Sequence, residues 1–213
     1  MEDGKKPRKS RVVTDRDYKF YSHVSNIISK AIYKLSHMSC VHDLLLPKQL
    51  LRVTKSLVLS VLYWGIELAG RDIRNLKRLQ KVQNMILRMV TKSDKKMSVR
   101  IMLEKLGLLN VQNQTRLAQM SLLRRTLKFN SCPVTLSHIA MPRMNSRDGY
   151  IRNSFPNKRK KHGDRALLPR SLELLNKMMW YKEKGKDSNA WFKQRAKKYL
   201  LSSFTNTNKI KAF

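Results

Sequence analysis

Apolar residues recur at helical spacing from Phe20 onward, and no segment shows a strong alternation of apolar and polar positions. The first run follows the i, i+3, i+4 pattern of one helix face. Its apolar residues are Phe20, Val24, Ile27, Ile28, Ala31, Ile32 and Leu35. Pro47 suits the first turn of a second helix. Residues 50–68 behind it are apolar almost all round, which predicts a buried helix that Gly70 ends.

Further helices are expected along the rest of the chain. Ser98 is a candidate cap for a short helix that Gly107 ends, and a longer helix should occupy about residues 110–128. Two short helices are expected near the C-terminal end, the second over about 188–202 with Ser188 as its cap.

The segment from 72 to 92 divides into two faces when it is drawn as a helix. One face is apolar and should pack, through Leu76, Leu79, Val82, Ile86 and Val90. Five cations fall within roughly 40° of one line on the other side. This cationic stripe consists of Arg74, Arg78, Lys81, Arg88 and Lys92. It contains no acid, whereas a solvated face normally mixes both signs. We therefore expect it to contact nucleic-acid phosphates, the alternative being an ordinary solvated face.

Gln83 lies on the apolar face of the same segment. A buried amide must find hydrogen-bond partners. We therefore interpret Gln83 as a residue that fixes packing and register rather than as a catalytic group.

Turn-forming residues and basic runs divide the chain into four parts. Residues 1–16 form a flexible basic arm, 17–130 a helical bundle, 131–169 a basic linker, and 170–213 short helices and a tail. The linker carries four consecutive cations that are also candidates for nucleic-acid contact, Lys158, Arg159, Lys160 and Lys161. The expected fold is all-α: a helical bundle from about 20 to 130, followed by a loop-rich basic segment and short C-terminal helices.

The charge balance indicates the class of partner. The 213 residues include 46 Lys and Arg against 14 Asp and Glu, which gives a formal net charge of +32. Apolar residues make up 41% of the chain, enough to build a core. Such a charge predicts a polyanionic partner, most simply RNA or DNA. No run approaches the roughly 18 apolar residues of a membrane span, so no membrane partner is expected. The basic runs fit nuclear import but also arise by chance in so basic a chain, so we expect a nuclear or cytoplasmic location.

The motifs of common active sites are missing. There is no Gly-rich phosphate loop, no Gly-x-Ser-x-Gly and no His-Glu-x-x-His. Two-metal phosphoryl transfer needs converging carboxylates, and the close pair Asp15 and Asp17 lies beside the basic arm. His37, Cys40 and His42 supply only three of the four ligands of a structural zinc site, so we interpret them as ordinary helix-end residues. We expect no catalytic residue, no metal and no cofactor.

Four segments carry recognisable motifs. Asp17–His23 resembles a family segment in which a strand ends and a helix that contains a His begins. Leu57–Gly65 is an apolar helix followed by Tyr-Trp-Gly. Leu76–Arg88 contains Leu-Gln and Gln-Asn pairs, and Leu103–Leu109 precedes a long helix. In this order the motifs resemble the region after the palm of LINE-type, non-LTR retrotransposon reverse transcriptases.

The resemblance covers roughly residues 15–205 and departs from the family in two ways. The C-terminal "Trp-Asn-x-Leu-Pro … Phe-Lys" ending is matched by Asn176 and Trp191–Lys193, but Leu175 and Met179 stand in place of its Trp and Pro. The Phe/Tyr-x-Asp-Asp box, which holds the polymerase metals in that family, does not occur in this sequence. No catalytic residue is therefore carried over.

What the resemblance implies is the thumb and the following helical region of an RNA-directed DNA polymerase, which help to hold template and primer. The expected function is that of a non-catalytic, nucleic-acid-binding fragment of such an enzyme. The palm and fingers portion of a parent polymerase is a further candidate partner. The residues leave open a second hypothesis. The protein would be a structural RNA-binding protein of a ribonucleoprotein particle, and its basic tails would become ordered when they bind RNA.

Overall fold

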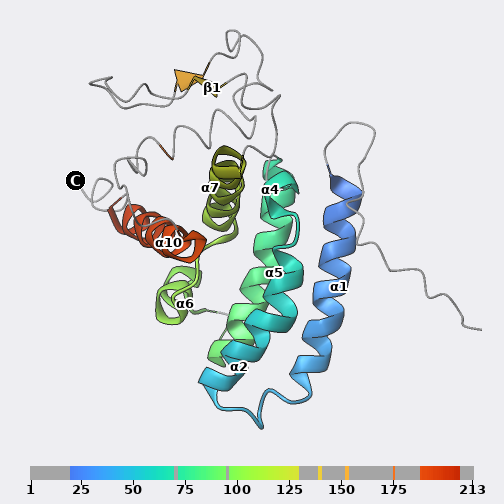
Figure 1. Cartoon of the computed structure of the whole chain (residues 1–213). Coiled ribbons are helices and arrows are strands. Elements are labelled where there is room, and N and C mark those ends of the chain that lie inside the picture. The colour runs from blue at the N-terminus through green and yellow to red at the C-terminus, as the bar shows by residue number, and fades with distance from the viewer. Residues whose placement is uncertain are drawn as a thin grey trace, which may run out of the picture.

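The computed structural model describes residues 20–69, 72–94, 96–129, 139–140, 152–153, 175 and 188–206. Over these residues the protein is all-α, as the periodicity predicts (Figure 1). Its helices are α1 (Tyr21–Ser39), α2 (Pro47–Thr54), the π-helical turn η1 (Lys55–Leu59), α3 (Ser60–Leu62), α4 (Ile66–Ala69), α5 (Ile73–Thr91), α6 (Val99–Leu106), α7 (Val111–Phe129) and α10 (Asn189–Asn206). Two short strands, β1 (Ile139–Ala140) and β2 (Arg152–Asn153), pair antiparallel. No helix in the described part of the chain is both long and apolar enough to cross a membrane.

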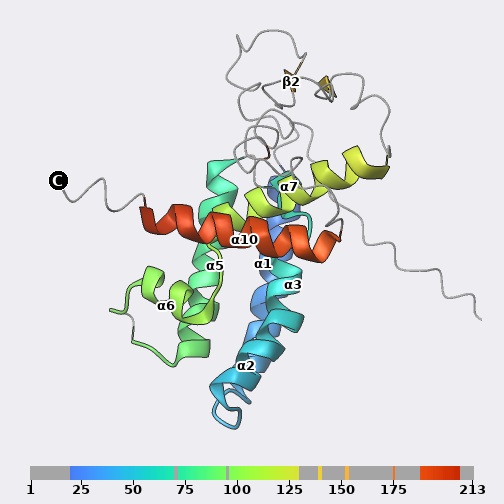
Figure 2. The same ribbon diagram turned by 60° about the vertical axis from the view of Figure 1, so that its left-hand side comes forward.

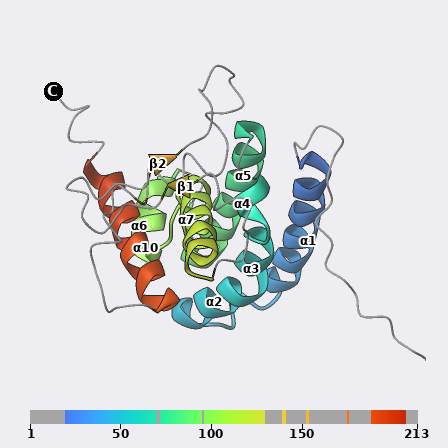
Figure 3. The ribbon, with the colours of Figure 1, turned by 45° about the horizontal axis from the view of Figure 1, so that its top comes forward.

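Helix α5 contacts α1, α2, α6 and α7 along one side and is exposed along the other (Figures 1 and 3). Its apolar face is buried as predicted, and Leu79 and Ile86 pack in one cluster with Val24, Ile27 and Leu35 of α1. Burying each such side chain contributes about 1.5–3 kcal/mol. The packing of α1 on α5 therefore supplies much of the stability of the bundle.

The apolar segment 50–68 departs from the prediction of a single, fully buried helix. The chain passes from α2 through η1 into α3, and the helix then breaks so that α4 begins at Ile66. The break occurs at Gly65, whose φ of 66° is a left-handed conformation that favours glycine. The segment is also buried on one side only, because Leu57 keeps 46% and Trp64 39% of their surfaces exposed.

Gln83 is fully buried and hydrogen-bonded, which confirms its predicted packing role. Its Nε2 donates to the Tyr63 hydroxyl at 2.8 Å and to the Leu109 carbonyl at 2.7 Å. Its Oε1 accepts from Gln80 Nε2 at 2.9 Å, and Gln80 Oε1 accepts from the Val111 backbone N–H at 3.0 Å. This pair of amides joins α5 to the turn before α4 and to the start of α7.

Helix α10 packs on α7 (Figure 2). Phe192 and Leu200 are buried against Leu123 and its neighbours on α7. Arg124 of α7 is 3% exposed; its Nη1 donates to Asn189 Oδ1 at 2.7 Å and its guanidinium lies 4.8 Å from the centre of the Phe192 ring. Arg124 therefore joins α7 to α10 through a hydrogen bond to Asn189, a residue 65 positions further along the chain.

The predicted helix ends are partly correct. The Ser188 hydroxyl accepts from Trp191 N at 3.1 Å, as expected of a cap, and Gly107 ends α6 with a φ of 59°. Ser98 occupies the N-cap position of α6, as expected, but its side chain makes no capping hydrogen bond. Asp72, which the sequence analysis did not single out, caps α5 through Oδ1, which accepts from Arg74 N at 2.9 Å.

Candidate nucleic-acid interface

The five cations of the stripe share one helix, but their surroundings differ. Arg74 and Lys81 are exposed on α5 and form no ion pair with any described acid. Lys77 is exposed between them and is also unpaired. Lys77 was not among the residues predicted to bind; it lies about 60° from the centre of the stripe, outside the roughly 40° within which the other five cations fall. These three lysine and arginine side chains form the exposed α5 face.

Arg78 is turned toward α1 rather than toward solvent. Its Nη2 donates to the Ser25 hydroxyl at 2.9 Å, and the guanidinium lies 4.3 Å from the centre of the Tyr21 ring. Its Nη1 is buried and has no hydrogen-bond partner among the described residues. Arg78 is therefore largely committed to holding α1 against α5.

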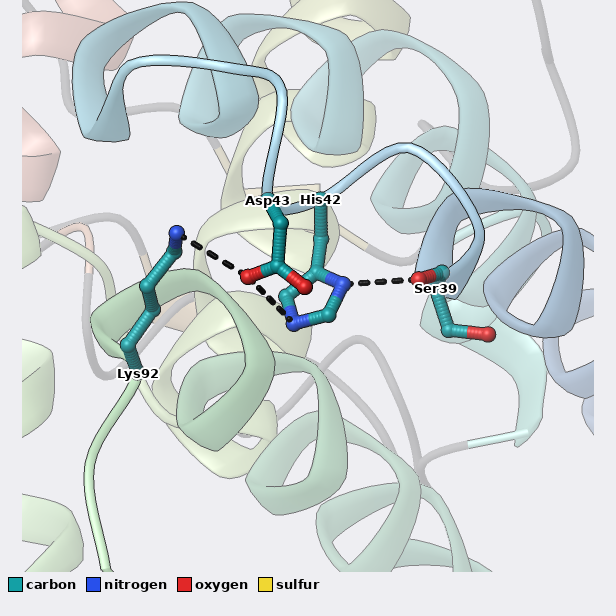
Figure 4. A network of polar contacts seen from close by, with 4 residues as sticks. All are labelled: Ser39, His42, Asp43 and Lys92. Carbon is teal, nitrogen blue, oxygen red and sulfur yellow. Dashed lines mark hydrogen bonds and ion pairs between the residues drawn. The ribbon is translucent and has the colours of Figure 1, made fainter.

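Arg88 and Lys92 occupy the other end of the stripe. Arg88 is half-buried, and its Nε is covered without a hydrogen-bond partner in the described ranges. Lys92 Nζ lies 3.3 Å from Asp43 Oδ1, to which His42 Nε2 also approaches within 3.3 Å (Figure 4). Asp43 partly neutralises the charge of Lys92 in this exposed pair, so the contribution of Lys92 to binding a polyanion is reduced.

A second group of cations comes from elements far apart in the sequence. Helix α10 exposes Lys193, Arg195 and Lys198. Burial, and then repulsion by Lys55 of η1, lower the pKa of Lys197. The fold therefore brings like charges together between η1 and α10, which no local sequence pattern signals.

Acids are too few to neutralise these surfaces. In the described ranges they are Asp43, Glu67, Asp72, Asp94 and Glu104. Asp43 binds Lys92 and His42, Asp72 caps α5, and Glu104 pairs with Arg100 at 2.9 Å. The exposed α5 face therefore keeps its full positive charge.

The residues considered for a metal site make ordinary local contacts. The His37 ring packs edge-on against Tyr33 with centroids 4.4 Å apart, and Cys40 Sγ lies 3.6 Å from the Ser36 carbonyl. His42 Nδ1 lies 2.6 Å from the Ser39 carbonyl. Within the described part of the chain, no three His, Cys, Asp or Glu side chains are grouped so as to hold a metal ion. The basic run Lys158–Lys161 and the pair Asp15 and Asp17 lie outside the described residues.

Comparisons of the chain with family models, with curated proteins and with solved structures gave no match. The case for function therefore depends on the residues and their geometry.

The four motif segments of the sequence, which the structure describes from Phe20 onward, contact one another in the fold. His23 of the first motif is buried and lies 5.1 Å, ring to ring, from Trp64 of the second. Gln83 of the third donates to Tyr63 of the second and to Leu109 of the fourth. Burial raises the pKa of Tyr63, and the weaker effect of the Gln83 hydrogen bond opposes this. The motif residues thus hold the core together, while the charges lie on the outer side of α5.

Proposed function

We propose that the protein binds nucleic acid without catalysing a reaction, as a thumb-like fragment of a non-LTR retrotransposon reverse transcriptase. The observation that carries the proposal is the exposed α5 face: Arg74, Lys77 and Lys81 form no ion pair with the described acids, on a chain with a net charge of +32. Charge of one sign along a rigid element suits a phosphate backbone, whose neutralisation releases counterions.

The dimensions of α5 fit this role. Arg74 and Lys81, the two ends of the exposed α5 face, are seven positions apart, which corresponds to about 10.5 Å along a helix axis. That length matches about three nucleotides of one strand at a rise of 3.4 Å each. A nucleic acid lying along this face would therefore meet three cations from the helix.

The resemblance supports a fragment without polymerase activity. The second and third motifs share one apolar cluster, and hydrogen bonds of Gln83 join Tyr63 of the second motif to Leu109 of the fourth; the sequence lacks an Asp-Asp box. The protein would then hold RNA or DNA, alone or beside the palm of a parent polymerase, and we expect a nuclear or cytoplasmic location.

A salt titration of binding tests the proposal. Affinity for RNA and DNA oligonucleotides is measured by fluorescence anisotropy over a range of salt, for the protein and for a triple variant of the exposed α5 face, Arg74→Gln, Lys77→Gln and Lys81→Gln. The triple variant should reduce the slope of log K against log salt by about 2 to 3. The matched control, Lys30→Gln, Lys48→Gln and Lys105→Gln, removes the same charge from exposed sites outside α5 and should change the slope much less. Equal slopes for the two triple variants, or no binding at low salt, would contradict the proposal.

The second group of cations favours one alternative, a structural protein of a ribonucleoprotein particle. Lys55 of η1 repels Lys197 of α10, and α10 also exposes Lys193, Arg195 and Lys198. Cations on elements other than α5 suit an RNA that wraps around its partner. Sedimentation of the native protein distinguishes the two. Co-migration with a large ribonucleoprotein particle would favour this alternative over the reverse-transcriptase fragment.

A further inference from the structure

A groove of about 580 Å³ lies between α5, α6 and the start of α7. Its volume falls in the range of small-molecule sites, roughly 300–1,000 Å³. The walls are apolar and include Leu76 of α5, with Val99 and Leu103 of α6, while Ile73 at the rim is 53% exposed. Figure 2 shows α6 lying alongside α5 at this place.

The groove is continuous with the exposed α5 face. Lys77 belongs to both, since it lines the groove and lies between Arg74 and Lys81 on the same helix. Arg100 lines the opposite wall; its Nε donates to Glu104 at 2.9 Å, which leaves the rest of the guanidinium for other partners. The opening is therefore flanked by cations on both sides.

The hydrogen bonds of the buried Gln80 and Gln83 amides determine which atom of the Asn84 amide is left without a partner among the described residues. The Leu109 carbonyl must accept from Gln83 and the Val111 N–H must donate to Gln80, which fixes the orientation of both glutamines. Gln80 Nε2 then donates to Asn84 Oδ1 at 2.8 Å. The Asn84 Nδ2 group therefore carries two N–H donors that have no hydrogen-bond partner among the described residues, and Asn84 lines the groove.

From these observations we infer that the groove holds an unpaired base of a single-stranded nucleic acid whose phosphates lie on the exposed α5 face. Apolar walls replace the stacking that the base loses, as in other sites that accept an extruded base. The Asn84 amide donates to a base edge rich in acceptors, such as the carbonyl oxygens of uracil or thymine. Lys77 binds the phosphate next to that base. The inference rests on the proposed function and narrows it to single strands.

The test compares single and double strands. The probes are oligo(U) and oligo(dT) of about 12 nucleotides, with a mixed-sequence duplex of the same length, all at about 20 mM salt. Val99→Glu puts a carboxylate into the groove at the first position of α6, where an acid suits the helix dipole. The control, Ile101→Glu, adds the same charge to the same helix on a side chain that is 53% exposed and does not line the groove.

Val99→Glu should weaken single-strand binding at least about tenfold more than Ile101→Glu, whereas the two variants should bind the duplex equally. Asn84→Asp is a second test with little risk to folding, because it keeps the oxygen that accepts from Gln80 and replaces the outward N–H donors by a negatively charged oxygen. It should weaken oligo(U) and oligo(dT) binding while duplex binding changes several-fold less. A 2-aminopurine placed within the oligonucleotide should also fluoresce more strongly on binding, because it leaves its neighbours.

Three results would count against the inference. Equal effects of Val99→Glu and Ile101→Glu on single-strand binding would show that the added charge alone weakens binding and that the groove is not occupied. Binding of the duplex but of neither single strand would refute the groove and leave the proposed function standing. Tight binding of an acidic peptide that Val99→Glu abolishes and Ile101→Glu does not, without competition from the single strands, would assign the groove to a protein partner instead. Absence of all nucleic-acid binding would refute the proposed function itself.

Discussion

The substitution Gly65→Ala should destabilise the fold well beyond the cost of its backbone conformation. Gly65 has a φ of 66°, and a non-glycine residue there costs roughly 1–2 kcal/mol. A Cβ at this position would also lie 2.9 Å from His23 Nε2. His23 is 2% exposed and packs against Trp64, so it cannot move aside without disturbing the core. Overpacking of this kind costs about 1–3 kcal/mol more.

Gly107 supplies a matched control. Its φ is 59°, so Gly107→Ala carries the same backbone cost, but an added Cβ would meet no heavy atom within 4 Å. We expect Gly65→Ala to lower the free energy of unfolding by about 2–5 kcal/mol and Gly107→Ala by about 1–2 kcal/mol. A loss of 5 kcal/mol would remove most of the stability of a marginal domain.

The assay is urea unfolding followed by circular dichroism at the helix band. A double-mutant cycle with His23→Ala isolates the contact. In the His23→Ala background, where the ring is absent, Gly65→Ala should lower the free energy of unfolding by at least about 1 kcal/mol less than it does in the unmodified protein. If Gly65→Ala and Gly107→Ala have the same effect within about 0.5 kcal/mol, or if the cycle shows no coupling, the packing of His23 on Gly65 is not as described.

Three further results are expected. Gln83→Leu should lower the free energy of unfolding by about 2–4 kcal/mol, because it leaves the Leu109 carbonyl without its donor; the exposed substitution Gln112→Leu, measured in the same urea series, should have almost no effect. Lys55→Gln should raise the pKa of Lys197 only part of the way toward its ordinary value of 10.5, because burial is the larger cause of the lowering; an NMR titration of the lysine side chains measures this, and an unchanged pKa would refute the contact. A primer-extension assay on the full chain should yield no template-dependent product, and any such product would overturn the non-catalytic proposal.

Much of the helical architecture was predictable because helix periodicity is local. The two faces of α5 follow from the spacing of Leu79, Val82 and Ile86 against the cations, and the apolar side is buried as expected. The burial of Gln83 follows from the same spacing, and the need of a buried amide for partners predicted its role. Its partners, the Tyr63 hydroxyl and the Leu109 carbonyl, lie on other elements and were not predictable from α5 alone.

The candidate site was only partly predictable. Helical angles placed Arg78 and Lys92 on the stripe, but Arg78 is held by Ser25 and Tyr21, and Lys92 by Asp43. These partners belong to α1 and to the segment after it, so the spacing within α5 carries no information about them. Residues 50–68 were predicted to form one helix because their composition does not show the left-handed turn at Gly65.

The all-α fold, the two faces of α5 and the excess of positive charge are evident from the sequence, because each depends on composition or on neighbours within a few turns. Which cations remain exposed, which segments meet at His23 and Gln83, and that Asn84 and Lys77 line the same apolar groove depend on how the helices pack. This is because a side chain finds its hydrogen-bond and ion-pair partners on other elements only after helices that are distant in sequence have packed together.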